Sequence, residues 1–118
     1  MVLIISCKAK NASDFKSWSK DKASKYAYDL KEENTISYEW HISDDRTEAT
    51  VIETYVNSDS MMIRLENYAA GPIAAVVVDQ FEITVVLCLV NAKQDAIDAF
   101  SVGGATFHTH HAGFHKSN

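Results

Sequence analysis

Apolar and polar residues alternate along the chain with two different periods, and each change of period marks a new element. Residues 2–9 form a short apolar run rich in β-branched side chains, which is typical of a buried strand. Residues 14–31 repeat apolar side chains every three or four positions, which predicts an amphipathic helix capped by Asn11 or Ser13. The first quarter of the chain is therefore predicted to be a strand followed by a helix.

A β-hairpin is predicted next. Residues 35–43 and 47–56 both alternate between apolar and polar side chains, and the three polar residues between them suit a tight connection. In the first of these strands Glu39 and His41 share one face. The opposite face consists of Ile36, Tyr38, Trp40 and Ile42. If the fold covers both sides of its sheet, we expect the polar face to be covered as well.

The second half of the chain repeats the succession of helix and strand. A helix capped by Asn57 or Ser58 is expected to carry an apolar stripe, and Gly71 and Pro72 interrupt it. The stripe consists of Met61, Leu65 and Tyr68. Residues 81–90 form the longest apolar, β-branched run, so we expect a central strand there. The remaining elements are expected at residues 73–78 (one or two helical turns), 93–100 (a short helix) and 105–111 (a last strand).

The order of these elements is typical of one fold. Strand, helix, strand, strand, helix and strand, with a small helix and strand appended, is the ferredoxin-like β-α-β-β-α-β pattern of an α+β protein with an antiparallel sheet. No repeat or linker divides it, so a single domain over residues 1–118 is expected. Helices on one face of the sheet leave an apolar second face uncovered. We therefore expect a homodimer that pairs through this face.

Composition and charge narrow the range of partners. The 118 residues carry a net charge of −5, and the surface lacks the excess of Lys and Arg that nucleic acid or anionic lipid requires. We therefore expect neither nucleic acid nor a membrane as a partner. No signal peptide or membrane span is expected either, which places the protein in the cytoplasm. Cys7 and Cys88 lie in apolar runs and are expected to be buried free thiols.

Three stretches carry a more specific pattern. The first is the strand segment Thr35, Ile36, Ser37, Tyr38, Glu39 and Trp40, and the second is Glu53, Tyr55 and Asn57 leading into a helix. The third is Ala112, Gly113, Phe114 and the later Lys116. In this order the stretches resemble the antibiotic biosynthesis monooxygenase-like family of dimeric α/β barrels. The resemblance spans residues 34–116 and implies a ferredoxin-like monomer that pairs sheet against sheet.

The resemblance also implies a function. Members of the family include cofactor-free oxygenases that act on quinols and polycyclic aromatics, haem-degrading relatives, and proteins of no assigned activity. The expected function is that of a cofactor-independent monooxygenase-like protein acting on a small aromatic or quinol compound, with no cofactor. The alternative is a non-catalytic dimeric domain of the same fold that has a small-molecule-binding or regulatory role.

Arg64 departs from the family pattern. It stands eleven residues after Glu53, where relatives commonly carry a helix histidine. An arginine is always protonated, so it can neither take a phenolic proton nor ligate iron. Arg64 is expected to form an ion pair with Glu53 or Glu66, or to anchor an anionic group of a ligand.

The candidate site combines aromatic and titratable residues. Aromatic walls suit flat ligands, and the candidates for such a pocket are Tyr38, Trp40, Tyr55 and Trp18, with core packing as the alternative. Glu53 and His41 are the candidate bases, with Glu39 beside them, because burial raises the pKa of a carboxyl group towards a useful range. Their alternative role is that of cross-strand neighbours without a function.

Histidines gather at the end of the chain, at His108, His110, His111 and His115. On a strand His108 and His110 point the same way and His111 the opposite way. A metal site would need further ligands from elsewhere, so no metal is expected and these are predicted to be surface or interface histidines. The sequence also contains no glycine-rich phosphate loop and no nucleophile elbow.

Overall fold

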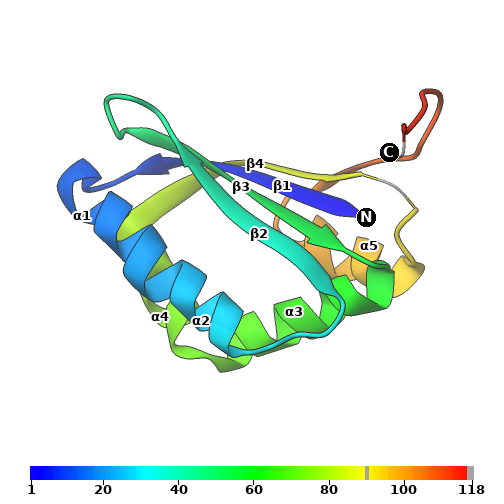
Figure 1. Cartoon of the computed structure of the whole chain (residues 1–118), viewed down its shortest axis with the longest axis horizontal. Helices are drawn as coiled ribbons and strands as arrows, with labels where there is room; N and C mark the ends of the chain where they lie inside the picture. The colour runs from blue at the N-terminus through cyan, green and yellow to red at the C-terminus, as the bar shows by residue number, and fades with distance from the viewer. Residues whose placement is uncertain (90, 117–118) are drawn as a thin grey trace.

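A curved sheet lies over a layer of helices (Figure 1) in the computed structural model, which describes residues 1–89 and 91–116. The strands are β1 (Val2–Ala9), β2 (Thr35–Ile42), β3 (Glu48–Tyr55), β4 (Phe81–Leu89) and β5 (Thr106–His108). The helices are α1 (Ala12–Trp18), the π-helical η1 (Ser19–Ser24), α2 (Lys25–Asp29), α3 (Ser58–Ala70), α4 (Pro72–Gln80) and α5 (Gln94–Ser101). Within the described ranges, the helices cover only one face of the sheet.

The sheet has the order β2-β3-β1-β4-β5. Strand β1 pairs antiparallel with both β3 and β4, and β2 pairs antiparallel with β3. This confirms the predicted ferredoxin-like α+β fold. Two details of the prediction were wrong. Strand β5 joins β4 in parallel, so the sheet is mixed, and β1 rather than β4 occupies its centre.

The first helical stretch is not one regular α-helix. Asn11 caps it as expected, because its side chain accepts a hydrogen bond from the Ser13 amide at 3.2 Å. After α1 the chain forms the π-helix η1, where the Ser24 hydroxyl donates to the Ser19 carbonyl at 2.6 Å. The α-helix then resumes as α2 and ends before Lys31, whose φ is 52°. Apolar periodicity does not report such a widened turn, because it changes the backbone and keeps the buried stripe.

The hairpin of β2 and β3 forms where it was predicted. Asp45 closes the connection by accepting hydrogen bonds from the backbone and side chain of Thr47 at 3.0 and 2.7 Å. The register shifts between Thr35 and Ser37, so Ile36 has no partner in β3 and is 65% exposed. The prediction that Ile36 shares a regular strand face with Tyr38 and Trp40 was therefore wrong, because the irregularity interrupts the alternation.

The end of α3, where α4 begins, lies in close contact with α2. Asn57 caps α3 by accepting a hydrogen bond from the Ser60 amide at 2.9 Å, as predicted. At Gly71 a Cβ atom would lie 1.9 Å from the hydroxyl oxygen of Tyr26, which itself donates to the Asn67 carbonyl at 3.1 Å. Glycine at this position therefore lets the end of α3 pack against the first helical stretch.

Strand β4 is less buried than its apolar sequence suggests. A register shift against β1 makes Ile83 the partner of Cys7 and Val85 the partner of Ser6. Ile83 consequently shares the helix-covered face with Cys7, whereas Val85 lies on the uncovered face. Both side chains are 49% exposed. The register shift was not predicted, and Val90 of the predicted strand lies outside the described residues.

The last strand is also shorter than predicted. Only Thr106–His108 pair with β4, opposite Leu87–Leu89, and the following residues up to Lys116 form no further strand. His110 and His111 therefore do not alternate on a strand, contrary to the prediction. In the described ranges no helix is long and apolar enough to cross a lipid bilayer.

Candidate functional site

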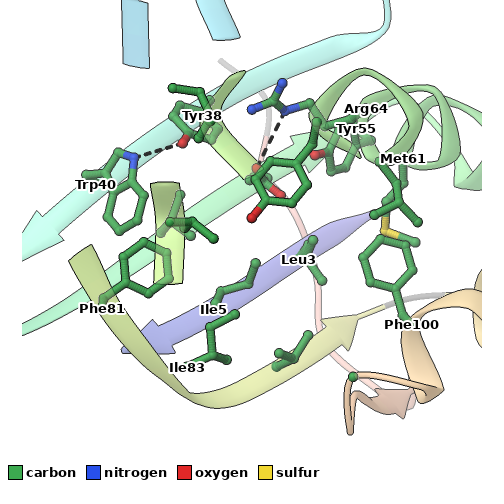
Figure 2. A pocket seen from close by; sticks show the side chains of 18 of the residues that line it. Leu3, Ile5, Tyr38, Trp40, Tyr55, Met61, Arg64, Phe81, Ile83 and Phe100 are labelled. Carbon is green, nitrogen blue, oxygen red and sulfur yellow. Dashed lines mark hydrogen bonds and ion pairs between the residues drawn. The ribbon is translucent and has the colours of Figure 1, made fainter. Parts of the chain in front are cut away.

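A cavity of about 330 Å³ lies between the helices and the covered face of the sheet. Its volume is at the lower end of the range for small-molecule sites. Aromatic and aliphatic side chains form most of its wall, and one side carries polar groups. Figure 2 shows Tyr38, Arg64 and Tyr55 along the upper wall, above Leu3, Ile5 and Ile83.

Strand alternation explains which side chains reach the cavity. Glu53 and Tyr55 lie two residues apart on β3, so both point towards the helices, and the partner of Glu53 on β2 is Tyr38. Trp40 follows on the same face of β2. Helix α3 packs against the covered face of these strands and supplies Arg64 from the same side as its apolar stripe. Two strands and one helix thus place the polar groups at one end of the cavity.

The polar end is a buried ion cluster. Arg64 and Glu53 are only 5% and 7% exposed, and Arg64 Nε lies 3.8 Å from Glu53 Oε1. A second carboxylate completes the cluster, because Glu32 Oε1 lies 3.7 Å from an Arg64 terminal nitrogen. The other oxygen of Glu32 accepts a hydrogen bond from Asn67 Nδ2 at 2.8 Å. One guanidinium therefore faces two carboxylates.

The cluster leaves hydrogen-bonding groups unused. Among the described residues, neither Nε nor the terminal nitrogen of Arg64 that faces Glu32 has a hydrogen-bond partner, although both are buried. Among the same residues, the Tyr55 hydroxyl makes no hydrogen bond of ordinary length but lies beside the Glu53 carboxyl, and Glu32 Oε1 is a buried acceptor without a hydrogen bond. Buried donors of this kind normally cost free energy unless something satisfies them. The nearest acceptors of the two Arg64 nitrogens are Glu32 Oε1 at 3.7 Å and Glu53 Oε1 at 3.8 Å, just beyond hydrogen-bond length.

Burial shifts the acid–base properties of this end. Desolvation raises the pKa of Glu53, and the Arg64 charge only partly opposes this. Burial and the neighbouring Glu53 charge raise the pKa of Tyr55 far above its usual range, so its phenol stays neutral. Desolvation raises the pKa of Tyr38 to about 12. The site therefore holds a carboxyl group able to accept a proton and a phenol that remains a donor.

An aromatic cluster forms the opposite end of the cavity. The Trp18 ring lies 6.2 Å from Trp40 and 5.8 Å from Phe81, centroid to centroid, in edge-to-face arrangements. Trp40 Nε1 donates to the Tyr38 hydroxyl at 2.9 Å, and the Arg64 guanidinium carbon lies 5.2 Å from the centre of the Tyr38 ring. These two contacts connect the aromatic wall to the ion cluster of Arg64. Trp18 belongs to the core and also lines the cavity.

The structure brings most of the predicted site residues together. Those that line the cavity are Glu53, Tyr38, Trp40, Tyr55, Arg64 and Trp18. His41 does not join them, because it alternates onto the other face of β2, where its side chain is 61% exposed and lies 3.9 Å from Glu39. In the single chain both of these side chains face solvent, because the helices cover only the other face of the sheet. Arg64 pairs with Glu53 as predicted, but the pair is buried.

Sequence reasoning missed Glu32. It lies in the turn between α2 and β2, within a polar stretch that reads as a solvated loop. Its side chain is nevertheless only 6% exposed, because it folds under α3 to reach Arg64 and Asn67. The sequence gives no signal for this burial, since charge and loop composition both indicate solvent. Within residues 1–89 and 91–116 no group of three metal-ligating side chains gathers, and the C-terminal histidines lie on and beyond β5.

Comparisons with known proteins agree on the fold. MupZ from Pseudomonas fluorescens is similar to the chain with a TM-score of 0.77 and 13% sequence identity, over 98% of this chain and 88% of MupZ. An antibiotic biosynthesis monooxygenase is similar with a TM-score of 0.53 and 12% identity, over 73% of this chain and 95% of that protein. No protein-family model matches the sequence, and no curated protein matches it. The chain thus shares the ferredoxin-like fold of an antibiotic biosynthesis monooxygenase, as its sequence pattern indicated.

Proposed function

We propose that the protein is a cofactor-independent monooxygenase-like enzyme that acts on a small aromatic or quinol compound in the cavity. The observation that carries the proposal is the buried carboxyl of Glu53 beside the Arg64 guanidinium, at the polar end of an aromatic-walled cavity. The fold shared with an antibiotic biosynthesis monooxygenase supports it. The expected binding residues are Tyr38, Trp40, Tyr55, Arg64 and Trp18.

Glu53 acts as the general base in this proposal. Its raised pKa makes it a better proton acceptor than an exposed carboxylate, so it can take the proton of a phenolic hydroxyl. The negative charge then moves from Glu53 to the ligand oxygen, where the buried Arg64 guanidinium stabilises it. The electron-rich anion reduces oxygen directly. One oxygen atom enters the ring, and the other leaves as water with the two hydrogens that the substrate loses.

Oxygen consumption tests this function. The purified protein is incubated with a panel of naphthols, hydroquinones and anthrones, without flavin or added metal, and oxygen uptake is followed with an electrode. Uptake above the spontaneous rate, abolished in Glu53→Gln and kept in the exposed control Glu48→Gln on the same strand, is expected. No uptake with any compound that stabilises the protein against heat would contradict the proposal.

A non-catalytic binding domain is the second candidate. The ion pair of Arg64 with Glu53 favours it, because a guanidinium beside the carboxylate opposes the rise of its pKa and weakens it as a base. Such a domain is expected to show a ligand-dependent increase in melting temperature without oxygen uptake. The same panel of compounds therefore separates the two candidates.

We further propose that the protein is a homodimer formed through the uncovered face of the sheet. Paired residues of adjacent strands share a face, and Ile4 of β1 pairs with both Ile52 and Leu87. This apolar row continues on both sides, with Val2 and Leu89 in one neighbouring row and Val85 in the other. Such a contiguous apolar surface is typical of a protein interface. A second copy placed face to face would cover it.

A further inference from the structure

We infer that the cavity selects uncharged ligands that carry a hydroxyl and a carbonyl group on neighbouring carbons, and that it rejects carboxylic acids of the same size. The inference rests on the proposed function only in placing the ligand in this cavity, and it concerns binding rather than oxygen chemistry. It follows from the charges and the unused hydrogen-bonding groups at the polar end.

The charge balance argues against an anionic ligand. Arg64 already lies within 4 Å of two carboxylates, Glu53 at 3.8 Å and Glu32 at 3.7 Å. When all three groups are ionised, the cluster carries one negative charge in excess, and both carboxylates are almost fully buried. A ligand carboxylate would add a second negative charge in a region that water does not screen. An unpaired arginine would favour an acidic ligand. With Glu32 beside Glu53, the two carboxylates outweigh the single guanidinium, so the cluster disfavours an acidic ligand.

The hydrogen-bonding groups at the polar end determine which donors and acceptors a neutral ligand must carry. Two buried nitrogens of Arg64 make ion pairs but no hydrogen bond among the described residues, whereas the Tyr55 hydroxyl lies beside the Glu53 carboxyl. The two Arg64 nitrogens can donate hydrogen bonds to an acceptor of the ligand, such as a carbonyl oxygen. Glu53 is the carboxyl acceptor that lines the cavity at this end, and it can accept a hydrogen bond from a ligand hydroxyl. Glu32 Oε1 is also a buried acceptor without a hydrogen bond to a described residue, but Glu32 does not line the cavity. Because Arg64 Nε and Glu53 Oε1 are only 3.8 Å apart, one ligand group with adjacent oxygens can meet both.

The rest of the cavity suits an apolar ring system. Away from the polar end, aromatic and aliphatic side chains form the wall, with Phe81 on one side and Phe100 on the other in Figure 2. Ile83 also lines the cavity and is half exposed, so the wall reaches the surface at β4. A flat ligand can therefore place its hydroxyl and carbonyl at Arg64 and Glu53 while its rings fill the apolar part.

Two matched compounds test the inference. 1-Hydroxy-2-acetonaphthone and 1-hydroxy-2-naphthoate share ring, hydroxyl and size, and differ in whether the neighbouring group is a ketone or a carboxylate. Their affinities are measured by isothermal titration calorimetry under nitrogen, at about pH 7.5, where the acid is ionised. We expect the ketone to bind roughly a hundredfold more tightly, because like charges placed together cost several kcal/mol.

Glu53→Gln provides the decisive variant. It keeps the shape of the side chain, removes one negative charge and adds a donor, so the acid should gain affinity at least tenfold while the ketone loses affinity. Glu48→Gln makes the same chemical change on the exposed part of β3 and should alter neither. Equal or tighter binding of the acid by the unmodified protein, an unchanged preference in Glu53→Gln, or no binding of either compound would overturn the inference. Since oxygen is absent, the outcome is independent of whether the protein is an oxygenase.

Discussion

One face of the sheet buries charged side chains, and the other face leaves apolar side chains uncovered. On the face towards the helices, a carboxylate and a guanidinium are buried next to a cavity. On the other face, the apolar side chains of Ile4, Ile52 and Leu87 have no helix above them among the described residues. The strands are the same and successive side chains alternate between the faces. What differs is the element that each face meets.

A buried charge and an uncovered apolar patch are the informative exceptions to the rule that apolar residues lie inside. The covered face keeps its charges because Arg64 of α3 pairs with both Glu53 and Glu32. The uncovered face keeps its apolar residues because, in our proposal, a second copy covers them. The covered face thus relates to the proposed reaction and the uncovered face to the proposed homodimer. Separate substitutions can test each face.

The largest effect is expected on the uncovered face. Leu87→Lys places a charge in the proposed interface, and the two-fold symmetry of a dimer introduces it twice. We expect the dissociation constant to rise at least about a thousandfold, because buried unpaired charges cost several kcal/mol. Sedimentation velocity at micromolar concentration measures the change from dimer to monomer.

Val102→Lys is the matched control, because Val102 is highly exposed at the end of α5. It should leave the dimer intact. A wild-type protein that sediments as a monomer of about 13 kDa, or a dimer that survives Leu87→Lys, would show that the uncovered face is not the interface.

The next largest effect is expected at the buried cluster. Arg64→Met fills the space of the arginine stem but leaves two carboxylates without a cation, so it should cost about 3–5 kcal/mol of unfolding free energy. The double variant Arg64→Met with Glu32→Gln should recover at least half of this loss. Urea denaturation measures both. Failure of the second change to restore stability would show that Glu32 does not balance the charge of Arg64.

The sequence predicted the fold better than the details of either face. Strand alternation and helix caps such as Asn11 and Asn57 are local signals, and each acts within a few residues. The π-helical turn and the register shifts in β2 and β4 are not encoded by apolar periodicity, because they depend on how neighbouring strands and helices fit. The prediction therefore gave the right elements but not the irregularities, and it placed Ile36 on a regular strand face that the register shift interrupts.

The candidate site was predictable in part. Glu53 could be found because a carboxylate is unusual in the middle of an apolar strand, and alternation placed Tyr38 and Trp40 on its side. His41 was an equally plausible base in the sequence, since alternation does not say which face the helices cover. Glu32 could not be found, because its burial depends on a contact with α3 that lies 35 residues away along the chain.

A smaller effect is expected when the base is removed from the covered face. Glu53→Gln retains shape and size but cannot accept a proton, so the proposed oxygenase rate should fall by roughly a hundredfold or more. The melting temperature should change little, because the amide keeps the shape of the carboxyl group and most of its hydrogen bonds. Oxygen uptake and thermal denaturation are measured on the same samples. A variant that unfolds outright would show that the carboxylate holds the structure together.

The smallest effect is a pH dependence of stability that belongs to the covered face alone. Because burial raises the pKa of Glu53 above its ordinary value of 4.5, the folded protein holds this proton at a pH where the unfolded chain has released it. The stabilisation is complete below about pH 4.5 and is lost as the pH rises through the folded-state pKa. Each unit by which the pKa is raised corresponds to about 1.4 kcal/mol.

Glu53→Gln isolates this contribution, because the amide behaves as a permanently uncharged side chain. The other groups that face Glu53, namely Arg64, Glu32 and the tyrosines Tyr38, Tyr55 and Tyr68, remain in both proteins, so their direct contributions largely cancel in the difference. We expect the unfolding free energy of the wild type, minus that of Glu53→Gln, to fall steadily as urea titrations move from pH 4.5 towards neutrality. The corresponding difference for Glu48→Gln on the exposed part of β3 should not fall in the same way. A difference that rises with pH would mean that the attraction of Arg64 outweighs desolvation, and that Glu53 is an ionised structural partner rather than a proton acceptor.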